Sequence, residues 1–516
     1  MKKRMKTVAL LLAAAMMTTA CGQAGKASSE ESKSQTASES KQESQASSQS
    51  TEEVKEELEP VTLRIFMGDK ATPDDALVAE YINELPQVQA LNVTIEIVKQ
   101  ASGSSEHYEK IPLLLASSEQ MDIGFDSGTN FTTRVYQNAY LDISEYLEGD
   151  ELYDALPENL WNGVTINGGI YGVPTYKELG AQWICYAQRD IIEEAGIDPE
   201  NITTLTLAEM EPILEVLQEK EYAPFMVLGK QYNNIMQLGL SGTYDSFISG
   251  FIAAVDRTEG KTVVNGYETE EFVETVKLMR SWNEKGYIAE DALTRSDFNS
   301  YWINGEGKYG LGIVSYAPLN QVNFAASPFN LDVVPLPVSV PIVSNDAAQG
   351  SIFGIYQKCE NPERAYEFLK LWNTDPEVKN AFCYGIPGRH YELVDGQVQT
   401  VENINDLYIG QNWTTGNCTI SYTKTNEPVD KWEVYEAWNE TGIAAANLGF
   451  ILNTESVSDK IATCNAVLAE YMPPLMLGFV EPESGIAQLQ EQLKAAGIDD
   501  IVAEVQTQYD AWLASK

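Results

Sequence analysis

The sequence has few residues of the kinds on which metal and nucleophilic chemistry depends. Its 516 residues include only two histidines, His107 and His390, so an HExxH zinc site is excluded. A Ser-His-Asp triad would have to use one of these two, and no GxSxG or GxxxxGK[ST] motif occurs. The sequence therefore predicts no cofactor and no metal site, and it favours a protein that is not an enzyme.

Cysteine is also scarce and shows no CxxC spacing. Apart from Cys21 near the N-terminus there are five cysteines: Cys185, Cys359, Cys383, Cys418 and Cys464. An odd, widely spaced set supports neither a disulfide framework nor a zinc site. We expect most of these residues to be buried thiols.

Basic residues are far fewer than acidic ones. The chain has 34 Lys and Arg against 76 Asp and Glu, which gives a formal net charge of −42. Such a surface repels nucleic acid and anionic lipid, so nucleic acid is not expected as a partner.

Long apolar runs are absent except for one near the N-terminus, residues 8–17, which follows Lys2, Lys3, Arg4 and Lys6. This run is too short to span a bilayer, which needs about 20 apolar residues, and it is typical of a secretory signal peptide. We therefore assign residues 1–20 to a signal peptide. The chain is then predicted to lie outside the cytoplasm.

The end of this segment resembles a bacterial lipobox. Small residues lead directly into Cys21, although Thr18 stands where the lipobox usually has leucine. The resemblance implies that Cys21 is lipidated and becomes the mature N-terminus; the alternative is an ordinary signal peptide followed by a chance cysteine. Residues 21–59 are rich in Ser, Glu, Gln and Lys, which predicts a disordered tether on the outer face of the cell membrane, with a length that favours a Gram-positive surface.

From residue 60 onward the chain has the pattern of an α/β protein. Apolar residues alternate over Val61–Met67 and again over Val93–Ile97, and a helix is expected between these strands after Thr72. Strand, helix and strand at this spacing form a βαβ unit with a parallel strand pair. Gly305–Gly310 matches GxGxxG, but it opens a strand rather than a helix, so we interpret it as a turn.

The order of several longer motifs resembles the family 1 extracellular solute-binding proteins of ABC importers, the maltose-binding-protein-like group. A C-terminal part, residues 493–512, resembles a lipoprotein subgroup in which an acidic residue usually stands at the position of Pro387. The motifs that carry the resemblance are Gly68-Asp69-Lys70, Ile111–Ser117, Met121-Asp122-Ile123, Tyr140–Tyr146, Gly168–Pro174, Gly350–Ile355, Asn361–Leu369 and Tyr384–Tyr391.

This resemblance implies a two-lobed, periplasmic-binding-protein-like (type II) α/β fold, in which a hinge closes the lobes around a solute. Lobe one would comprise residues 60–170 and 338–385, and lobe two residues 171–337 and 386–516. The chain would cross between the lobes near Tyr171–Trp183, Val333–Pro337 and Ile386–Arg389.

The resemblance also implies positions for the solute-binding residues. Asp69 and Lys70 follow the first strand, Asp126 follows the strand at 122–125, and Glu178 lies in the first crossing. Tyr316 follows a strand where the family often places a stacking aromatic, and Trp413 lies in a Gly-, Asn- and Thr-rich loop.

The implied function is the receptor of an ABC importer that delivers its solute to a membrane permease. Nine Trp and 26 Tyr, together with acidic candidates, favour an oligosaccharide as the solute, because sugars present apolar faces and a rim of hydroxyls. The alternatives are a glycoside-active surface enzyme, a receptor for peptides or polyamines, and a sensory lipoprotein.

Overall fold

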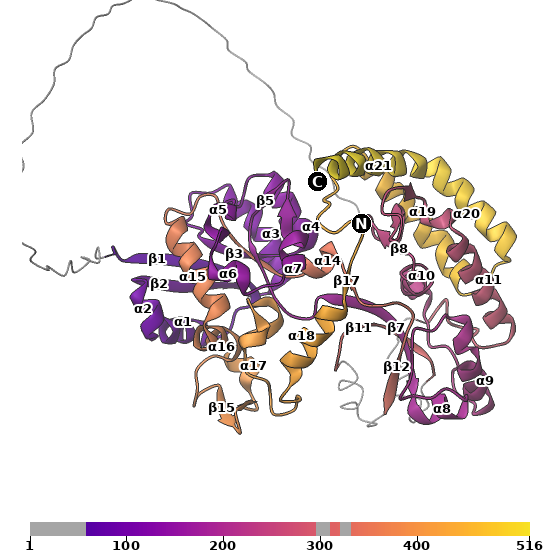
Figure 1. Ribbon diagram of the computed structural model, residues 1–516, viewed down its shortest axis with the longest axis horizontal. Coiled ribbons are helices and arrows are strands. Elements are labelled where there is room, and N and C mark those ends of the chain that lie inside the picture. Colours follow the sequence, from indigo (N-terminus) through magenta and orange to yellow (C-terminus); the bar gives the residue numbers. More distant parts are fainter. Residues whose placement is uncertain (1–57, 296–309, 320–331) are drawn as a thin grey trace, which may run out of the picture. The chain divides into compact units, whose positions relative to one another are not determined.

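The computed structural model describes residues 58–295, 310–319 and 332–516 (Figure 1). These residues form an α/β protein with two large hydrophobic cores. The first core draws mainly on residues 63–179 and 342–382, and the second on residues 185–336 and 457–509. We call the surroundings of these cores lobe one and lobe two; the predicted two-lobed α/β fold is therefore confirmed. In the described part of the chain, no helix combines the length and the apolarity that a membrane crossing requires.

Lobe one is built on a mixed five-stranded sheet. The first strand pairs in parallel with its neighbours on both sides, with Val61 opposite Val93, and this confirms the predicted βαβ unit. In sheet order the strands are β2 (Val93–Gln100), β1 (Val61–Lys70), β3 (Ile123–Asp126), β14 (Ile352–Ile355) and β6 (Val173–Pro174).

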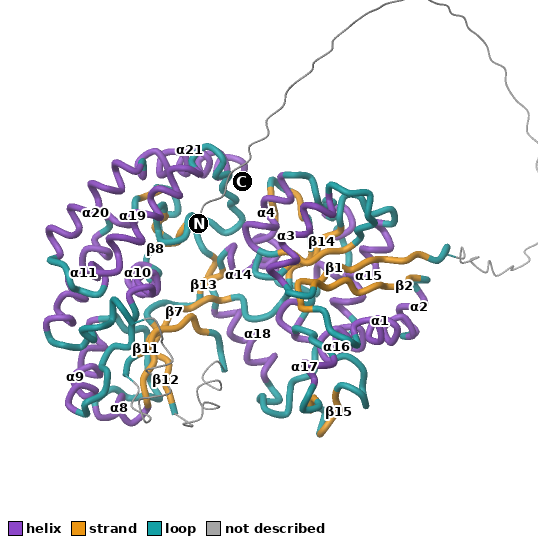
Figure 2. The backbone as a smooth tube through the Cα atoms, turned by 180° about the vertical axis from the view of Figure 1, so that it is seen from behind, coloured by secondary structure: helices purple, strands orange, loops and turns teal. Residues whose placement is uncertain are grey.

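Helices pack around this sheet (Figure 2). The side chain of Asp375 accepts hydrogen bonds from two backbone amides and thereby caps the start of α16. Trp372 on α15 is buried in the first core. The helices are α1 (Asp75–Glu84), α2 (Pro86–Ala90), α3 (Ser104–Leu115), α4 (Gly128–Tyr136), α5 (Ser144–Leu147), α6 (Glu151–Asp154), α7 (Glu158–Val164), α14 (Asn345–Ala348), α15 (Pro362–Thr374) and α16 (Pro376–Tyr384), and a short hairpin joins β4 (Thr165–Ile166) to β5 (Gly169–Ile170).

Lobe two contains a three-stranded sheet and most of a second five-stranded sheet, whose strand β13 (Ile342–Val343) packs in the first core. The long strand β7 (Gly180–Gln188) pairs with β11 (Gly312–Tyr316), β12 (Val333–Pro337) and β13, and β13 also pairs with β17 (Ile443–Ala444). A separate antiparallel sheet has the order β10 (Val263–Val264), β9 (Ala254–Asp256), β8 (Tyr244–Ser246).

The helices of lobe two bury their apolar faces in the second core. Trp282 is fully buried, and Ile498, Val505 and Tyr509 of the last helix lie in the second core. Gly497 has a φ of +93°, which lets one helix end and the next begin without a loop. The elements are α8 (Arg189–Glu194), η1 (Ala208–Met210), α9 (Glu211–Glu219), η2 (Gly229–Gln231), α10 (Tyr232–Leu240), η3 (Gly266–Glu268), α11 (Glu270–Glu284), α19 (Ser458–Met476), α20 (Pro482–Ala496) and α21 (Ile498–Ser515).

The segment after α16 corrects the predicted boundary at residue 386. Tyr408 is buried in the first core, and Ile386 and Ile404 pack against it, so the chain does not cross to lobe two at Ile386–Arg389. Asp74 explains the placement, because its buried carboxylate accepts hydrogen bonds from the Arg389 side chain and from His390 Nε2. The elements that follow are β15 (Tyr391–Val394), β16 (Gln397–Thr400), α17 (Ile404–Leu407), η4 (Asn412–Thr414), η5 (Cys418–Ile420) and α18 (Lys431–Thr441).

The three passages between the cores can be read from the order of the elements. The first runs from β6 to β7, within the range predicted for it. The second passage is predicted at Val333–Pro337, but these residues form β12 and pair with β7 throughout their length. The second passage therefore begins after β12. The third begins after α18 and runs through residues 442–457, which alternate between the two cores.

Candidate functional site

A cavity of about 300 Å³ lies between the first passage, the end of β11 and helix α14. We call it the candidate cavity. It brings together two of the residues predicted from the sequence, Glu178 and Tyr316. Its lining consists of Lys177, Glu178, Leu179, Gly180, Ser315, Tyr316, Ala317, Asp346, Ala347 and Gly350.

Helix α18 holds the first passage in place through its side chains. The Asn439 side chain accepts a hydrogen bond from the amide of Leu179 and donates one to the carbonyl of Lys177, both at 2.8 Å. The indole Nε1 of Trp438 donates to the carbonyl of Gly180 at 3.2 Å. A Cβ at Gly180 would lie 2.6 Å from Pro341 and 3.1 Å from this nitrogen, so the close approach of Pro341 favours glycine there.

Aromatic side chains surround the charged residues of the cavity. The ring of Tyr316 lies edge-on to that of Trp438, with centroids 5.5 Å apart. Lys177 Nζ lies 5.4 Å from the ring centroid of Trp413, which is 51% exposed. Trp413 therefore adjoins the candidate cavity through Lys177, and about half of its surface is exposed.

The charged groups here remain partly accessible. Lys177 Nζ and Glu178 Oε1 are 3.7 Å apart, with side chains 18% and 34% exposed. Burial and then the charge of Glu178 raise the pKa of Tyr435, on α18, so its hydroxyl stays protonated and can donate. Ammonium, carboxylate and phenol groups together match the donors and acceptors of a polyhydroxylated solute.

Asp126 does not line the candidate cavity, contrary to its expected role. It is the last residue of β3, and its side chain is fully buried in an ion pair with Arg134 of α4. The carboxylate also accepts hydrogen bonds from the hydroxyl of Tyr140 at 2.8 Å and from the amide of Ser127 at 2.9 Å. A buried carboxylate needs such partners, and here lobe one supplies all of them.

Asp69 and Lys70 also lie away from the candidate cavity. Asp69 is only 3% exposed, and burial raises its pKa to about 6, although Lys99 and the amide of Gln411 oppose the increase. Lys99 itself is buried and pairs with Asp75 at 2.8 Å. Lys70 is exposed at the end of β1. Of the six predicted binding residues, the structure therefore gathers Glu178, Tyr316 and the adjoining Trp413.

Sequence reasoning missed three residues at this site, namely Lys177, Asp346 and Trp438. Trp438 fits no apolar helical stripe, and that misfit was the one available signal for it. Lys177 neighbours the predicted Glu178 but has no motif of its own. Asp346 lines the cavity from α14, whose four residues are too few to show a periodic pattern.

Both histidines have structural roles. Burial lowers the pKa of His107 to about 4, and its Nε2 lies 2.9 Å from the carbonyl of Phe125. His390 Nδ1 accepts a hydrogen bond from the amide of Ile386, so Nε2 is the nitrogen that donates to Asp74. Among the described residues no serine hydroxyl is hydrogen-bonded to either ring, so a Ser-His-Asp triad is not formed there.

Cysteine and acidic side chains do not form a metal site in the described part of the chain. Within it, no group of three or more His, Cys, Asp or Glu residues could hold an ion. The five cysteines described are free, and four of them are buried, in line with the expectation of buried thiols.

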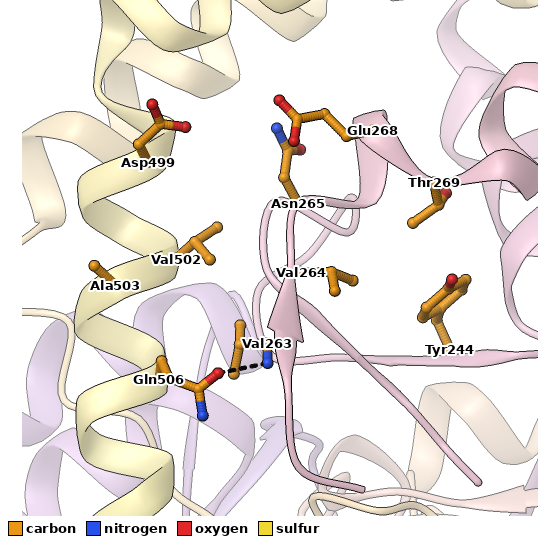
Figure 3. Close-up of a pocket in the computed structure, with 10 residues that line it drawn as sticks. All are labelled: Tyr244, Val263, Val264, Asn265, Glu268, Thr269, Asp499, Val502, Ala503 and Gln506. Carbon is orange, nitrogen blue, oxygen red and sulfur yellow. Dashed lines mark hydrogen bonds between the residues drawn. The ribbon is translucent and has the colours of Figure 1, made fainter. Parts of the chain in front are cut away.

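A larger cavity of about 700 Å³ lies within lobe two, between α21 and β10 (Figure 3). Gln506 of α21 crosses one end of it and accepts a hydrogen bond from the amide of Val263 at 2.7 Å. No sequence-predicted binding residue lines this cavity.

Comparison with known proteins gives two family matches. Residues 70–379 match the bacterial extracellular solute-binding proteins, and residues 446–514 match a domain of unknown function. A carbohydrate ABC transporter substrate-binding protein from Streptococcus pneumoniae serotype 4 is 29% identical over 475 residues, which cover 89% of this chain and 92% of that protein.

Solved structures share the fold along most of its length. The N-glycan transport solute-binding protein NgtS of S. pneumoniae superposes with a TM-score of 0.71 at 24% identity, covering 88% of this chain and 99% of that one. Its complex with Man5GlcNAc gives a TM-score of 0.57 at 26% identity, with 89% and 99% covered. An HMO-binding, ABC-transporter-associated protein from Bifidobacterium longum infantis gives 0.60 at 13% identity, with 88% and 99% covered.

Proposed function

The chain belongs to the bacterial extracellular solute-binding proteins, and from this premise we propose that it captures an oligosaccharide in the candidate cavity for an ABC importer. The observation that carries the proposal is the meeting of Glu178 and Tyr316 in one cavity, with the free ring of Trp413 beside it. Aromatic rings cover the apolar faces of a sugar, while the carboxylate and ammonium groups bind its hydroxyls.

The relatives support a carbohydrate rather than a peptide. One is named as a carbohydrate receptor, and another was solved with the oligosaccharide Man5GlcNAc bound. A branched glycan is larger than a cavity of about 300 Å³. We therefore propose that the glycan is bound by one end in the candidate cavity, while the rest extends past Trp413, and that the lobes close around it by a hinge motion.

The proposal includes a membrane location. Members of the family act outside the cytoplasm, and we propose that lipid on Cys21, which lies outside the described residues, anchors the protein beside a permease. Cys21→Ser should release the protein into the medium or leave its signal peptide uncleaved. A variant that is cleaved correctly and stays on the membrane would contradict the anchor.

We further propose that the bound glycan is released unchanged, without any hydrolysis. Incubating the protein with Man5GlcNAc and separating the products by chromatography tests this directly. Any turnover that scales with protein concentration would favour the glycoside-active alternative.

Isothermal calorimetry tests the solute class. The panel should contain Man5GlcNAc, a fructo-oligosaccharide, a peptide and spermidine, so that each alternative has a representative. We expect binding to a glycan, and Glu178→Gln should weaken it while Glu119→Gln, which changes an acid on the surface of lobe one, should not. Tight binding of the peptide or spermidine with none of either glycan would refute the carbohydrate assignment.

A further inference from the structure

One lysine of lobe one is buried without an acidic partner. Lys379 lies on α16, and none of its surface is exposed. Its ammonium donates hydrogen bonds to the carbonyl of Thr415, to the hydroxyl of Thr415 at 3.2 Å and to the carbonyl of Asn412 at 3.3 Å. The Cys418 thiol lies 3.9 Å away, and no carboxylate in the described part of the chain pairs with this lysine.

The partners of Lys379 make it dependent on one short stretch of backbone. A lysine ammonium has three N–H donors, and a buried one is stable only where they are bound. Lys99, the other buried lysine of this lobe, pairs with the carboxylate of Asp75. Lys379 instead uses three oxygens from two residues, so its charge is stabilised only while those residues keep their conformation.

These two residues belong to the turn of residues 411–418, which we call the Trp413 turn. Trp413 is 51% exposed, whereas residues 414–418 are buried. The two carbonyls that bind Lys379 belong to Asn412 and Thr415, which lie on either side of Trp413 in the sequence. An otherwise buried turn therefore displays one large aromatic ring, and the ammonium fixes the backbone before and after it.

The other side of the Trp413 turn contacts the surroundings of the candidate cavity. The amide of Cys418 donates to the carbonyl of Tyr176 in the first passage at 2.8 Å. The hydroxyl of Ser351, which follows the cavity-lining Gly350, donates to the carbonyl of Thr414 at 2.9 Å. The turn thus lies between the lysine on α16 and the residues of the candidate cavity.

We propose that Lys379 is a positioning residue for solute binding. Its ammonium holds the Trp413 turn so that Trp413 contacts the part of the glycan that extends beyond the candidate cavity, and the protein thereby selects long glycans over short ones. The inference rests on the proposed function, in which the glycan extends past Trp413. Because Lys379 is buried, it does not touch the solute; it lowers the cost of binding by fixing the ring in advance.

Two glycans of different length separate this role from a general loss of structure. In Lys379→Met, calorimetry should show up to about a tenfold loss of affinity for Man5GlcNAc, as expected for an aromatic contact that is no longer held in place. Affinity for the shorter Man1GlcNAc should stay unchanged. Lys370→Met is the matched control, because it removes a lysine of lobe one that pairs with Asp150 away from the turn, and it should change neither affinity.

A double-mutant cycle shows whether Lys379 acts through Trp413. Adding Lys379→Met to Trp413→Ala should cost no further affinity for Man5GlcNAc, whereas independent effects would add and would overturn the inference. If Lys379→Met does not fold, Thr415 provides the second test. Thr415→Val removes one oxygen that binds the ammonium and should weaken Man5GlcNAc binding alone, while Thr415→Ser keeps the hydroxyl and should bind like the wild type. An equal loss for both glycans in folded Thr415→Val would also overturn the inference.

Thiol labelling tests the hold on the turn without any ligand. The Cys418 thiol lies 3.1 Å from the carbonyl of Asn412, and burial raises its pKa to about 11, so it reacts slowly while the turn is folded. In Lys379→Met it should react with Ellman's reagent about tenfold faster or more, because hydrogen bonds to a charged group no longer oppose local opening. Cys185, buried in lobe two, should keep its rate, and peptide mass spectrometry distinguishes the two sites.

The outcomes separate this inference from the proposed function. An unchanged Cys418 rate overturns the inference even if the glycans bind as expected. Faster labelling together with no binding of either glycan by the wild type would refute the proposed function, and the role in glycan length with it, although the lysine does hold the turn.

Discussion

Asp126 and Glu178 are two carboxylates from the same sequence argument, and the structure gives them opposite environments. Asp126 ends a central strand of lobe one, where its side chain is fully buried and paired with Arg134. Glu178 lies in the first passage between the lobes, with a side chain 34% exposed and a lysine 3.7 Å away. The first carboxylate is held inside lobe one by its partners, and the second stays accessible in the candidate cavity.

The difference shows what the end of a strand does and does not indicate. In α/β sheets, ligands bind beyond the carboxyl ends of strands, and Asp126 stands at such a strand end. The side chain nevertheless turns into the lobe, because Arg134 and Tyr140 supply the hydrogen bonds that a buried carboxylate needs. Depth within the lobe therefore decides whether an acid at such a position is buried in an ion pair or accessible to a ligand.

Removing the carboxylate of Asp126 should have the largest effect. Asp126→Ala leaves the Arg134 guanidinium buried without its partner, and breaking such a pair costs about 3–5 kcal/mol. Urea denaturation should show this loss, while Glu178→Gln should unfold like the wild type. If folded Asp126→Ala instead lost glycan binding with unchanged stability, the contrast between the two acids would be wrong.

Asp69 is a third predicted binding residue with a carboxylate, and its burial should make the stability of the protein depend on pH. Burial raises its pKa to about 6 from an ordinary 3.8, so the folded protein holds the proton more tightly than the unfolded chain does. This contribution to stability is complete below about pH 4 and is lost as the pH rises through 6. Asp69→Asn removes the titration, so relative to the wild type it should gain up to about 3 kcal/mol between pH 4 and pH 8.

Denaturation of both proteins at each pH measures this gain. Lys70→Gln is the matched control, because Lys70 is the exposed neighbour of Asp69 on the same strand. A gain that is the same at pH 4 and pH 8 would show that Asp69 does not titrate in this range.

Glu178→Gln tests the role of the accessible carboxylate. A hydrogen bond to a charged group contributes about 1.5–3 kcal/mol, so Man5GlcNAc affinity should fall by a factor of about 10 to 100. The free energy of unfolding should stay the same, since the side chain is partly exposed and makes one weak ion pair. Calorimetry and denaturation of the same preparation separate these effects, and an equal loss in both would argue for a structural role.

Trp413→Ala should have the smallest effect. An aromatic contact is worth about 0.5–1.5 kcal/mol, so glycan affinity should fall by up to about tenfold. Stability should hardly change, because the ring is 51% exposed. Trp372→Ala, in which a buried ring is lost from the first core, is the contrasting variant and should destabilise the fold by about 3–5 kcal/mol. Unchanged affinity in Trp413→Ala would remove this residue from the site.

The sequence by itself determined the fold class and the main elements of each lobe. Alternating residues in β1 and β2 depend on neighbours within one element, so periodicity was enough to predict these strands. The resemblance to solute-binding proteins likewise depended on the order of short motifs along the chain.

Only the tertiary structure decided which of the predicted polar residues meet. Residues 386–423 lie on lobe one because the buried Asp74 binds Arg389 and His390, more than three hundred residues away in the sequence. Asp126 does not line the candidate cavity because it is buried in an ion pair with Arg134. Glu178 lines the cavity together with Tyr316, because α18 holds the first passage in place by hydrogen bonds. Burial and charge pairing arise when folding brings distant residues together, so they cannot be predicted from local periodicity.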